Sequence, residues 1–200
     1  MRTPDDFIEL LAAHKDCDDR LIERARMLSS LEVETSTDPK IIRIRKMIYS
    51  VQGEIHRMRG FVRLEPRGRK VLYGRMSPDH EIGFEVADFF AKRFPGTIIV
   101  LGDETKSWAS FCTEGGFLRT RGDGVTKSLE ELGSLINIET DEDDAEAEVS
   151  DLWEIYYKSQ DQPREDGRRS FGGRISKKAL RSAGMETERG RGNKRLGDFI

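Results

Sequence analysis

The change from helix to strand falls within residues 54–64, EIHRMRGFVRL. Up to Met58, apolar residues recur every three or four positions, which is the spacing of one buried helix face. Gly60 suits the position just after a helix C-terminus. From Phe61 to Glu65, apolar and polar residues alternate, as in a strand with one buried face. The stretch predicts a helix that leads directly into a strand, and hence an α+β protein.

Toward the N-terminus, the same spacing predicts two helices. The second begins at Asp38-Pro39, where Asp serves as the N-cap and Pro takes the first helical position. Its apolar stripe consists of Ile41, Ile44, Ile48, Val51, Ile55 and Met58. The first helix begins at Thr3 and carries a similar stripe as far as Leu28, a length of about six turns. The short connection between them favours antiparallel packing, so we expect an N-terminal helical hairpin over residues 1–59.

Toward the C-terminus, short strands alternate with turn residues. Residues 61–65 and 70–76 predict a β-hairpin around the turn sequence PRGR, residues 66–69. A helix is expected after Ser77-Pro78-Asp79, followed by strands at 97–101 and 107–112. The predicted sheet is small and mainly antiparallel, with one helix crossing it.

The remaining sequence predicts two further parts. An aromatic helix near residues 149–157 is expected to close the α+β core, which covers residues 60–158 and continues from the helical hairpin. Residues 159–200 form a Gly/Arg-rich basic tail with few apolar side chains.

Composition excludes several classes of protein. Of the 200 residues, 36% are hydrophobic and 36% charged, and no apolar run approaches the roughly 18 residues of a membrane span. Cys17 and Cys112 lack the spacing of a disulfide framework or a zinc site, and the three histidines form no ligand pattern. We therefore expect a cytoplasmic protein with no membrane partner, no bound metal and no other cofactor.

The net charge of −3 conceals strong segregation. Residues 40–75 hold 11 basic and 2 acidic side chains, and residues 163–200 hold 11 and 5, whereas residues 139–162 hold 1 and 10. Such blocks are typical either of solvated faces or of surfaces that bind a polyanion. The sequence leaves both interpretations open.

A cluster of arginines surrounds the helix-to-strand junction. Guanidinium groups bind phosphate bidentately, so several of them at one junction favour a phosphate-binding site. The candidate nucleic-acid-binding residues are Arg57, Arg59, Arg63, Arg67, Arg69, Arg75, Arg93 and Lys106. The alternative is a structural clamp, in which Arg57 or Arg59 pairs with Glu54, Glu65 or Asp103.

Catalytic chemistry has one candidate centre. His56 paired with Glu54 or Asp103 could transfer protons near neutral pH, although a histidine in this context is more often structural. Asp103, Glu104 and Asp123 are conceivable magnesium ligands, but their spacing matches no nuclease pattern.

The junction is also part of a wider resemblance. Residues 54–64, together with Tyr73, the segments 76–80 and 89–95, Gly102-Asp103 and the Leu-Trp-aromatic segment 152–157, follow the order of conserved blocks in one family. Residues 38–158 resemble a prokaryotic domain-of-unknown-function family whose members are described as probable DNA metabolism proteins. Relatives occur beside a radical-SAM partner or fused to a uracil-DNA-glycosylase-like domain.

The resemblance and the charge pattern together predict a function. We expect a nucleic-acid-binding or accessory protein in DNA metabolism or repair, with DNA or RNA as a partner and a radical-SAM protein as a second partner implied by the resemblance. One alternative is an enzyme acting on DNA or a nucleotide through His56 with Glu54 or Asp103. Another is a protein-interaction module whose acidic run at 139–151 meets a basic partner.

Overall fold

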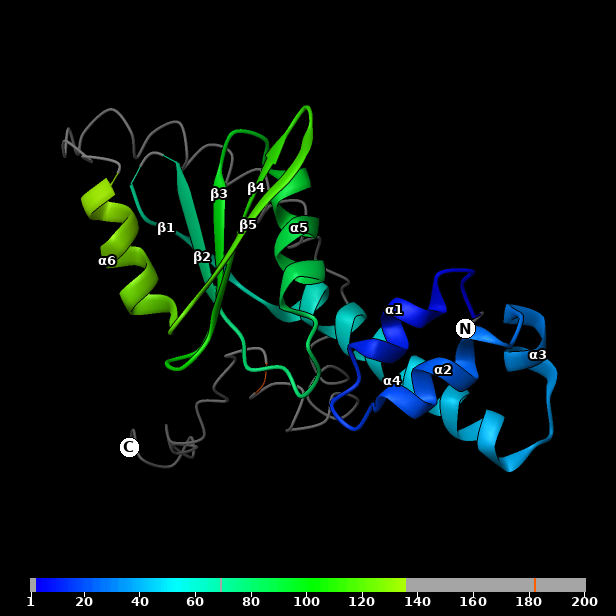
Figure 1. Cartoon of the computed structure of the whole chain (residues 1–200). Coiled ribbons are helices and arrows are strands. Elements are labelled where there is room, and N and C mark those ends of the chain that lie inside the picture. Colours follow the sequence, from blue (N-terminus) through cyan, green and yellow to red (C-terminus); the bar gives the residue numbers. More distant parts are fainter. Residues whose placement is uncertain (1–2, 69, 136–181, 183–200) are drawn as a thin grey trace, which may run out of the picture.

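A computed structural model of the chain describes residues 3–68, 70–135 and 182 (Figure 1). The described part contains six helices and five strands. In chain order they are α1 (Phe7–Ala12), α2 (Asp19–Arg26), α3 (Ser30–Thr35), α4 (Pro39–Phe61), β1 (Leu64–Pro66), β2 (Val71–Arg75), α5 (Gly83–Arg93), β3 (Ile98–Gly102), β4 (Ser107–Thr113), β5 (Gly116–Gly122) and α6 (Val125–Leu135).

The five strands form one sheet in the order β1-β2-β3-β4-β5. β2 and β3 are parallel because α5 carries the chain between them, and the other three pairs are antiparallel. The predicted α+β class, the mainly antiparallel sheet and the crossing helix are confirmed. The β1–β2 hairpin turns at Gly68, whose positive φ of 66° is a conformation that glycine adopts without strain.

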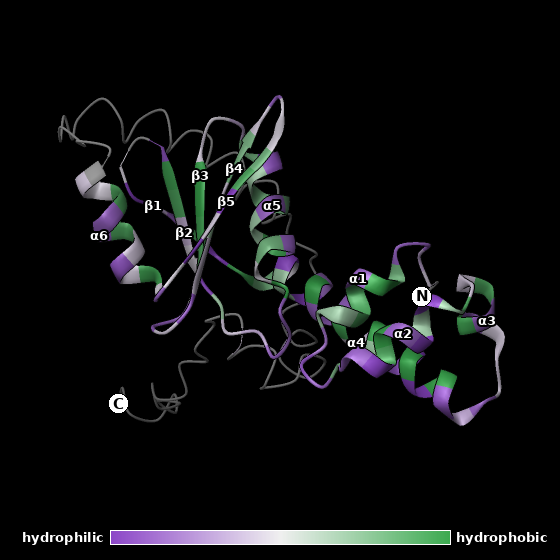
Figure 2. Cartoon of the chain, viewed as in Figure 1, coloured by the Kyte–Doolittle hydropathy of each residue, from purple (hydrophilic) through white to green (hydrophobic). Residues whose placement is uncertain are grey.

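Helices cover both faces of the sheet. The alternation of side chains along the strands explains how one sheet serves two cores. On one face, Leu72, Ile99 and Leu101 pack with α5 and the C-terminal half of α4. On the other, Val71 and Val100 pack with α6. Figure 1 shows α5 and α6 on opposite sides of the sheet, and Figure 2 shows that β2 and β3 between them are largely hydrophobic.

The N-terminal region differs from the expected hairpin. The predicted single helix ending near Leu28 is wrong, because the chain forms α1, α2 and α3 before α4 begins. Asp18 accepts the backbone N–H of Leu21 and starts α2, while Ser29 and Glu32 form a capping box that starts α3. The apolar spacing persists across these breaks because all three helices bury residues in one core with the first half of α4.

Helix α4 joins this N-terminal core to the sheet. Its predicted start at Asp38-Pro39 is confirmed, since the Asp38 carboxylate accepts the backbone N–H of Lys40. Its end lies slightly later than expected: the helix includes Gly60 and Phe61, and the strand begins only at Leu64. Ile44, Ile48, Val51, Ile55 and Met58 of the predicted stripe are all buried.

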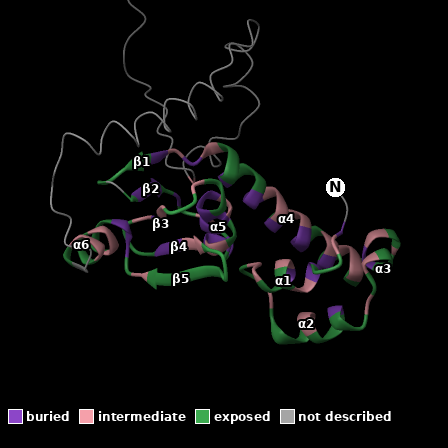
Figure 3. Ribbon diagram, turned by 90° about the horizontal axis from the view of Figure 1, so that it is seen from above, coloured by how far each residue is buried: buried purple, intermediate pink, exposed green. Residues whose placement is uncertain are grey.

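The elements around the sheet differ in their exposure to solvent. Figure 3 shows that α5 is largely buried and that the edge strand β5 is exposed. The residues of β5 are exposed up to Arg121. No helix in residues 3–68 or 70–135 is both long and apolar enough to span a membrane.

The predicted aromatic helix at 149–157 and nearly all of the basic tail lie outside the described residues. Ser182 is described, and its carbonyl accepts the backbone N–H of Ser77 at 2.7 Å.

Candidate functional site

One face of α4 carries Arg57, a predicted nucleic-acid-binding residue, together with two cations that were not predicted. Arg43, Lys46, Ser50, Gly53 and Arg57 follow a spacing of three and four residues, so they share one side of the helix. We call these five residues the cationic stripe. Its three cations are exposed, and at 1.5 Å per residue the stripe is about 21 Å long.

The hairpin that follows α4 carries a second group of cations. Arg67 and Lys70 flank the turn between β1 and β2, and Arg75 ends β2. All three are exposed. Arg69, also predicted to bind nucleic acid, lies outside the described residues. The stripe and the hairpin are consecutive in the chain, and α4 leads directly into β1 (Figure 1).

The exposed cations of this region are not neutralised by the described part of the protein. Seven lysine and arginine side chains of residues 40–75 are exposed and form neither an ion pair nor a side-chain hydrogen bond there, whereas the exposed Arg59 donates to the carbonyl of Glu85. The seven are Lys40, Arg43, Lys46, Arg57, Arg67, Lys70 and Arg75. The structural clamp considered from the sequence is therefore absent among these residues.

The acidic residues considered for that clamp accept hydrogen bonds from uncharged groups instead. Glu54 is 3% exposed, and its two carboxylate oxygens accept the backbone N–H groups of Asp79 and His80, each at 2.9 Å. Glu65 accepts the hydroxyl of Tyr73, which raises the pKa of that hydroxyl.

Asp103 is similarly occupied, in the turn between β3 and β4. Its Oδ1 accepts the backbone N–H groups of Thr105 and Lys106 at 2.7 and 3.0 Å, and its Oδ2 accepts the Ser77 hydroxyl at 2.9 Å. Burial favours the protonated acid, but these hydrogen bonds outweigh it and lower the pKa of Asp103. The carboxylate organises a turn and its hydrogen bonds involve no arginine.

Five lysines and arginines elsewhere in the described structure are paired with carboxylates: Arg24, Lys106, Arg119, Arg121 and Lys127. Arg119 of β5 pairs with Asp88 of α5. Glu81 pairs with both Lys106, at 3.2 Å, and Arg121, at 3.0 Å. Lys106 was a predicted nucleic-acid-binding residue, and the structure separates it from the unpaired group by giving it this partner.

Three other predicted arginines lie around the end of α4 and the end of α5. The Arg59 guanidinium stacks 4.9 Å from the Phe89 ring centroid and donates to the carbonyl of Glu85 at 3.1 Å. Arg63 donates to the Gly60 carbonyl at 3.3 Å and so caps the C-terminus of α4. Arg93 is exposed in the last turn of α5. Arg59 and Arg63 thus hold the helix–sheet junction together.

The proposed catalytic pair is not assembled. His56 is exposed on α4 and follows the buried Glu54 by two residues. Two residues along a helix differ in direction by about 200°, so His56 lies on the side of α4 opposite Glu54. The hydrogen bonds of Asp103 likewise do not involve His56. Asp103, Glu104 and Asp123 belong to no described cluster of three or more residues suited to a metal ion.

The structure instead brings together two histidines, His14 and His80. His14 and His80 stack with ring centroids 4.4 Å apart, and burial of His14 together with the neighbouring His80 lowers the pKa of His14. His80 Nδ1 accepts the N–H of Lys15 at 3.4 Å, so the neutral ring carries its proton on Nε2 and donates it to Ser50 Oγ at 2.9 Å. In this tautomer His80 cannot take the Ser50 proton, which argues against a serine nucleophile.

The contact between His14 and His80 was not predicted, because the two residues are distant in the chain. His80 follows the predicted helix start Ser77-Pro78-Asp79, and no local pattern links it to His14. The sequence holds no signal for this contact beyond the presence of the two histidines.

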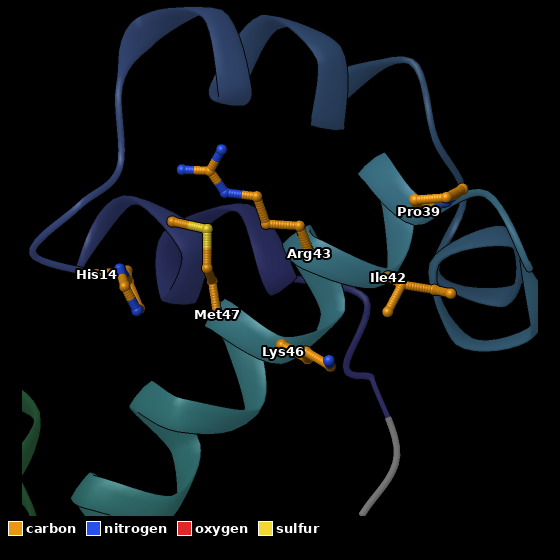
Figure 4. Close-up of a pocket in the computed structure, with 6 residues that line it drawn as sticks. All are labelled: His14, Pro39, Ile42, Arg43, Lys46 and Met47. Atoms are coloured by element: carbon orange, nitrogen blue, oxygen red, sulfur yellow. The ribbon is translucent and has the colours of Figure 1, made fainter.

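A shallow hollow lies at the N-terminal end of the cationic stripe. It has a volume of about 330 Å³ and is lined by His14, Pro39, Ile42, Arg43, Lys46 and Met47. Figure 4 shows Arg43 and Met47 projecting from the same side of α4, with His14 on the segment that follows α1. The hollow combines cationic heads with apolar walls.

Comparisons with known proteins place the chain in a family but give no function. A family model described as a domain of unknown function, DUF4130, matches residues 20–169. No curated protein and no solved structure matches the chain.

Proposed function

The chain belongs to the DUF4130 family of domains of unknown function, and we propose from its own residues that it binds nucleic acids through α4 and the β1–β2 hairpin. The observation that carries the proposal is the concentration of unpaired cations. Within residues 40–75, seven exposed cations form neither an ion pair nor a side-chain hydrogen bond in the described structure. The exposed cations of the other described residues either pair with carboxylates, as Lys106, Arg119 and Arg121 do, or are spread over the segment after α1, α2 and α5.

Unpaired cations favour a polyanionic ligand for an electrostatic reason. Each cation that contacts a phosphate releases condensed counterions from the nucleic acid, and this release drives binding. A cation already paired with a carboxylate gains less from such a contact, because it must first give up its partner. The protein's net charge of −3 does not oppose this, since the local field at the surface guides the approach of a phosphate.

The biological setting of the proposal comes from the resemblance to probable DNA metabolism proteins. We propose an accessory role in DNA metabolism or repair, in which this chain contacts the nucleic acid and a radical-SAM partner supplies the chemistry. The arrangement of His56, Glu54 and Asp103 offers no support for catalysis by this chain itself. Glu54 accepts the backbone N–H groups of Asp79 and His80, Asp103 accepts N–H groups of its own turn, and His56 is exposed on another side of α4.

A salt titration tests the proposal. Fluorescence anisotropy of labelled single-stranded and duplex DNA and RNA is measured between about 50 and 200 mM salt, where phosphate contacts lose affinity steeply. The triple variant Arg57→Gln, Arg67→Gln, Arg75→Gln should reduce the slope of log K against log salt by about 0.9 for each lost phosphate contact on duplex DNA. The matched control is Arg20→Gln, Lys92→Gln, Lys127→Gln, which removes the same charge from α2, α5 and α6. Equal slopes for the two triple variants would contradict the proposal.

A further inference from the structure

We propose that the hollow at the start of the cationic stripe binds one unstacked nucleotide of a single-stranded nucleic acid. This inference rests on the proposed function and assigns it a strand state and a base-binding position. The base would enter the hollow against Met47 and the His14 ring, and its phosphate would contact Arg43 and Lys46.

The lining of the hollow matches both parts of a nucleotide. Pro39, Ile42 and Met47 supply apolar surface, and Arg43 and Lys46 supply two cations at the same opening. Binding sites for small planar groups are typically apolar with a few placed polar side chains. A volume of about 330 Å³ is at the lower end of the range for ligand pockets, so it suits a single base.

Single strands fit this surface better than duplexes do. In a duplex the base faces are stacked on their neighbours and cannot contact an apolar wall, whereas a single strand can turn one base outward. Proteins that bind single strands combine a cationic path for the backbone with surfaces that take bases. The stripe and the hollow provide these two features side by side.

The rest of the stripe is suited to the strand that leaves the hollow. Ser50 Oγ accepts a hydrogen bond from His80, so its own O–H is available to donate to a phosphate oxygen. Gly53 brings the helix backbone to the surface, and a Cβ there would lie 3.2 Å from an Arg57 guanidinium nitrogen. Arg57 therefore lies over Gly53, in line with Arg43 and Lys46.

The test compares three probes of similar phosphate number on the full chain. They are an oligothymidylate of about 24 nucleotides, the same strand with abasic sites throughout, and a duplex of about 12 base pairs. If one base occupies the hollow, the abasic strand should bind up to about tenfold more weakly, which is the low end of the range for a base stacked on an aromatic ring, because the walls here are mainly aliphatic. The Arg43→Gln, Lys46→Gln variant should weaken binding to the oligothymidylate far more than Lys92→Gln, Lys127→Gln, which removes equal charge elsewhere.

A second measurement locates the base. Nuclear magnetic resonance signals of the Met47 methyl group and the His14 ring should shift with the oligothymidylate and shift much less with the abasic strand. Equal affinity for the normal and abasic strands, or equal or tighter binding of the duplex, would overturn this inference while leaving salt-dependent binding intact. Loss of salt-dependent binding to all three probes would instead overturn the proposed function as well.

Discussion

The buried carboxylate of Glu54 accepts the backbone N–H of His80 at 2.9 Å, and so fixes the loop before α5 to the middle of α4. The second oxygen of the same carboxylate accepts the N–H of Asp79 at an equal distance. His80 in turn stacks on His14, and Glu81 donates its backbone N–H to the Ala13 carbonyl at 2.9 Å. This small set of contacts joins the N-terminal helices, α4 and the sheet domain.

Replacing Glu54 with Gln should destabilise the protein by about 1–3 kcal/mol, because one of two buried N–H donors then faces an amide N–H₂ instead of an acceptor. Urea denaturation monitored by circular dichroism measures the change. Glu65→Gln is the matched control, since Glu65 is exposed and its carboxylate bonds only the Tyr73 hydroxyl among the described residues. Equal stability of the Glu54 variant and the wild type would show that the loop is not held through this carboxylate.

The histidine stack predicts a pH dependence of stability. The pKa of His14 is lowered in the folded protein, so the unfolded chain binds the proton more readily. Above the unfolded pKa of about 6.5 both states are neutral at this site and there is no effect. As the pH falls below that value, the unfolded state gains protons first and the free energy of unfolding decreases.

The variant His14→Asn isolates this contribution. The Asn amide oxygen can accept the Asp16 N–H, as His14 Nδ1 does at 3.1 Å, but it cannot be protonated. Between pH 7.5 and 5.5, a window around the unfolded pKa of about 6.5, the wild type should lose more stability in chemical denaturation than the variant. A parallel pH dependence of the two proteins would rule out His14 as its source.

The N-terminal core predicts a large effect at Ile48, which is fully buried. Ile48→Ala should lower the free energy of unfolding by about 2–5 kcal/mol, because it removes buried methyl groups and leaves a cavity. The partly exposed Ile41 offers a control on the same helix, where the Ala substitution should cost clearly less. A melting temperature of Ile48→Ala at the wild-type value would mean that the three N-terminal helices contribute little to stability.

The sequence predicted most elements from Pro39 onward, because their signals are local. The Asp38-Pro39 start, the turn at Gly68 and the apolar run of β3 each reflect chemistry within a few residues. The N-terminal helices were merged because a continuous apolar stripe outweighed two local caps, Asp18 and the Ser29 capping box, which are visible in the sequence.

The candidate site was only partly predictable for the same reason. The number of cations in residues 40–75 is a sequence property, but their pairing depends on where distant carboxylates lie. Lys106 is paired because Glu81, 25 residues away in the chain, comes within 3.2 Å of it. The stack of His14 on His80 is a contact of this kind too, and no spacing rule indicates it.

Gly53 allows the electrostatic role of the cationic stripe to be separated from its stability. Glycine in a helix interior costs about 0.5–1 kcal/mol relative to alanine, so Gly53→Glu and Gly53→Gln should both stabilise α4. Glu at this position also lies four residues before Arg57, the favourable order for a helical ion pair. The Glu variant should therefore be at least as stable as the Gln variant in thermal unfolding.

The Glu variant should nevertheless bind oligothymidylate more weakly and with a smaller salt slope, because its carboxylate neutralises Arg57 and repels the phosphates. Gln has the same shape without the charge and should retain most of the affinity. Equal binding by the two variants would show that the nucleic acid does not approach this face of α4.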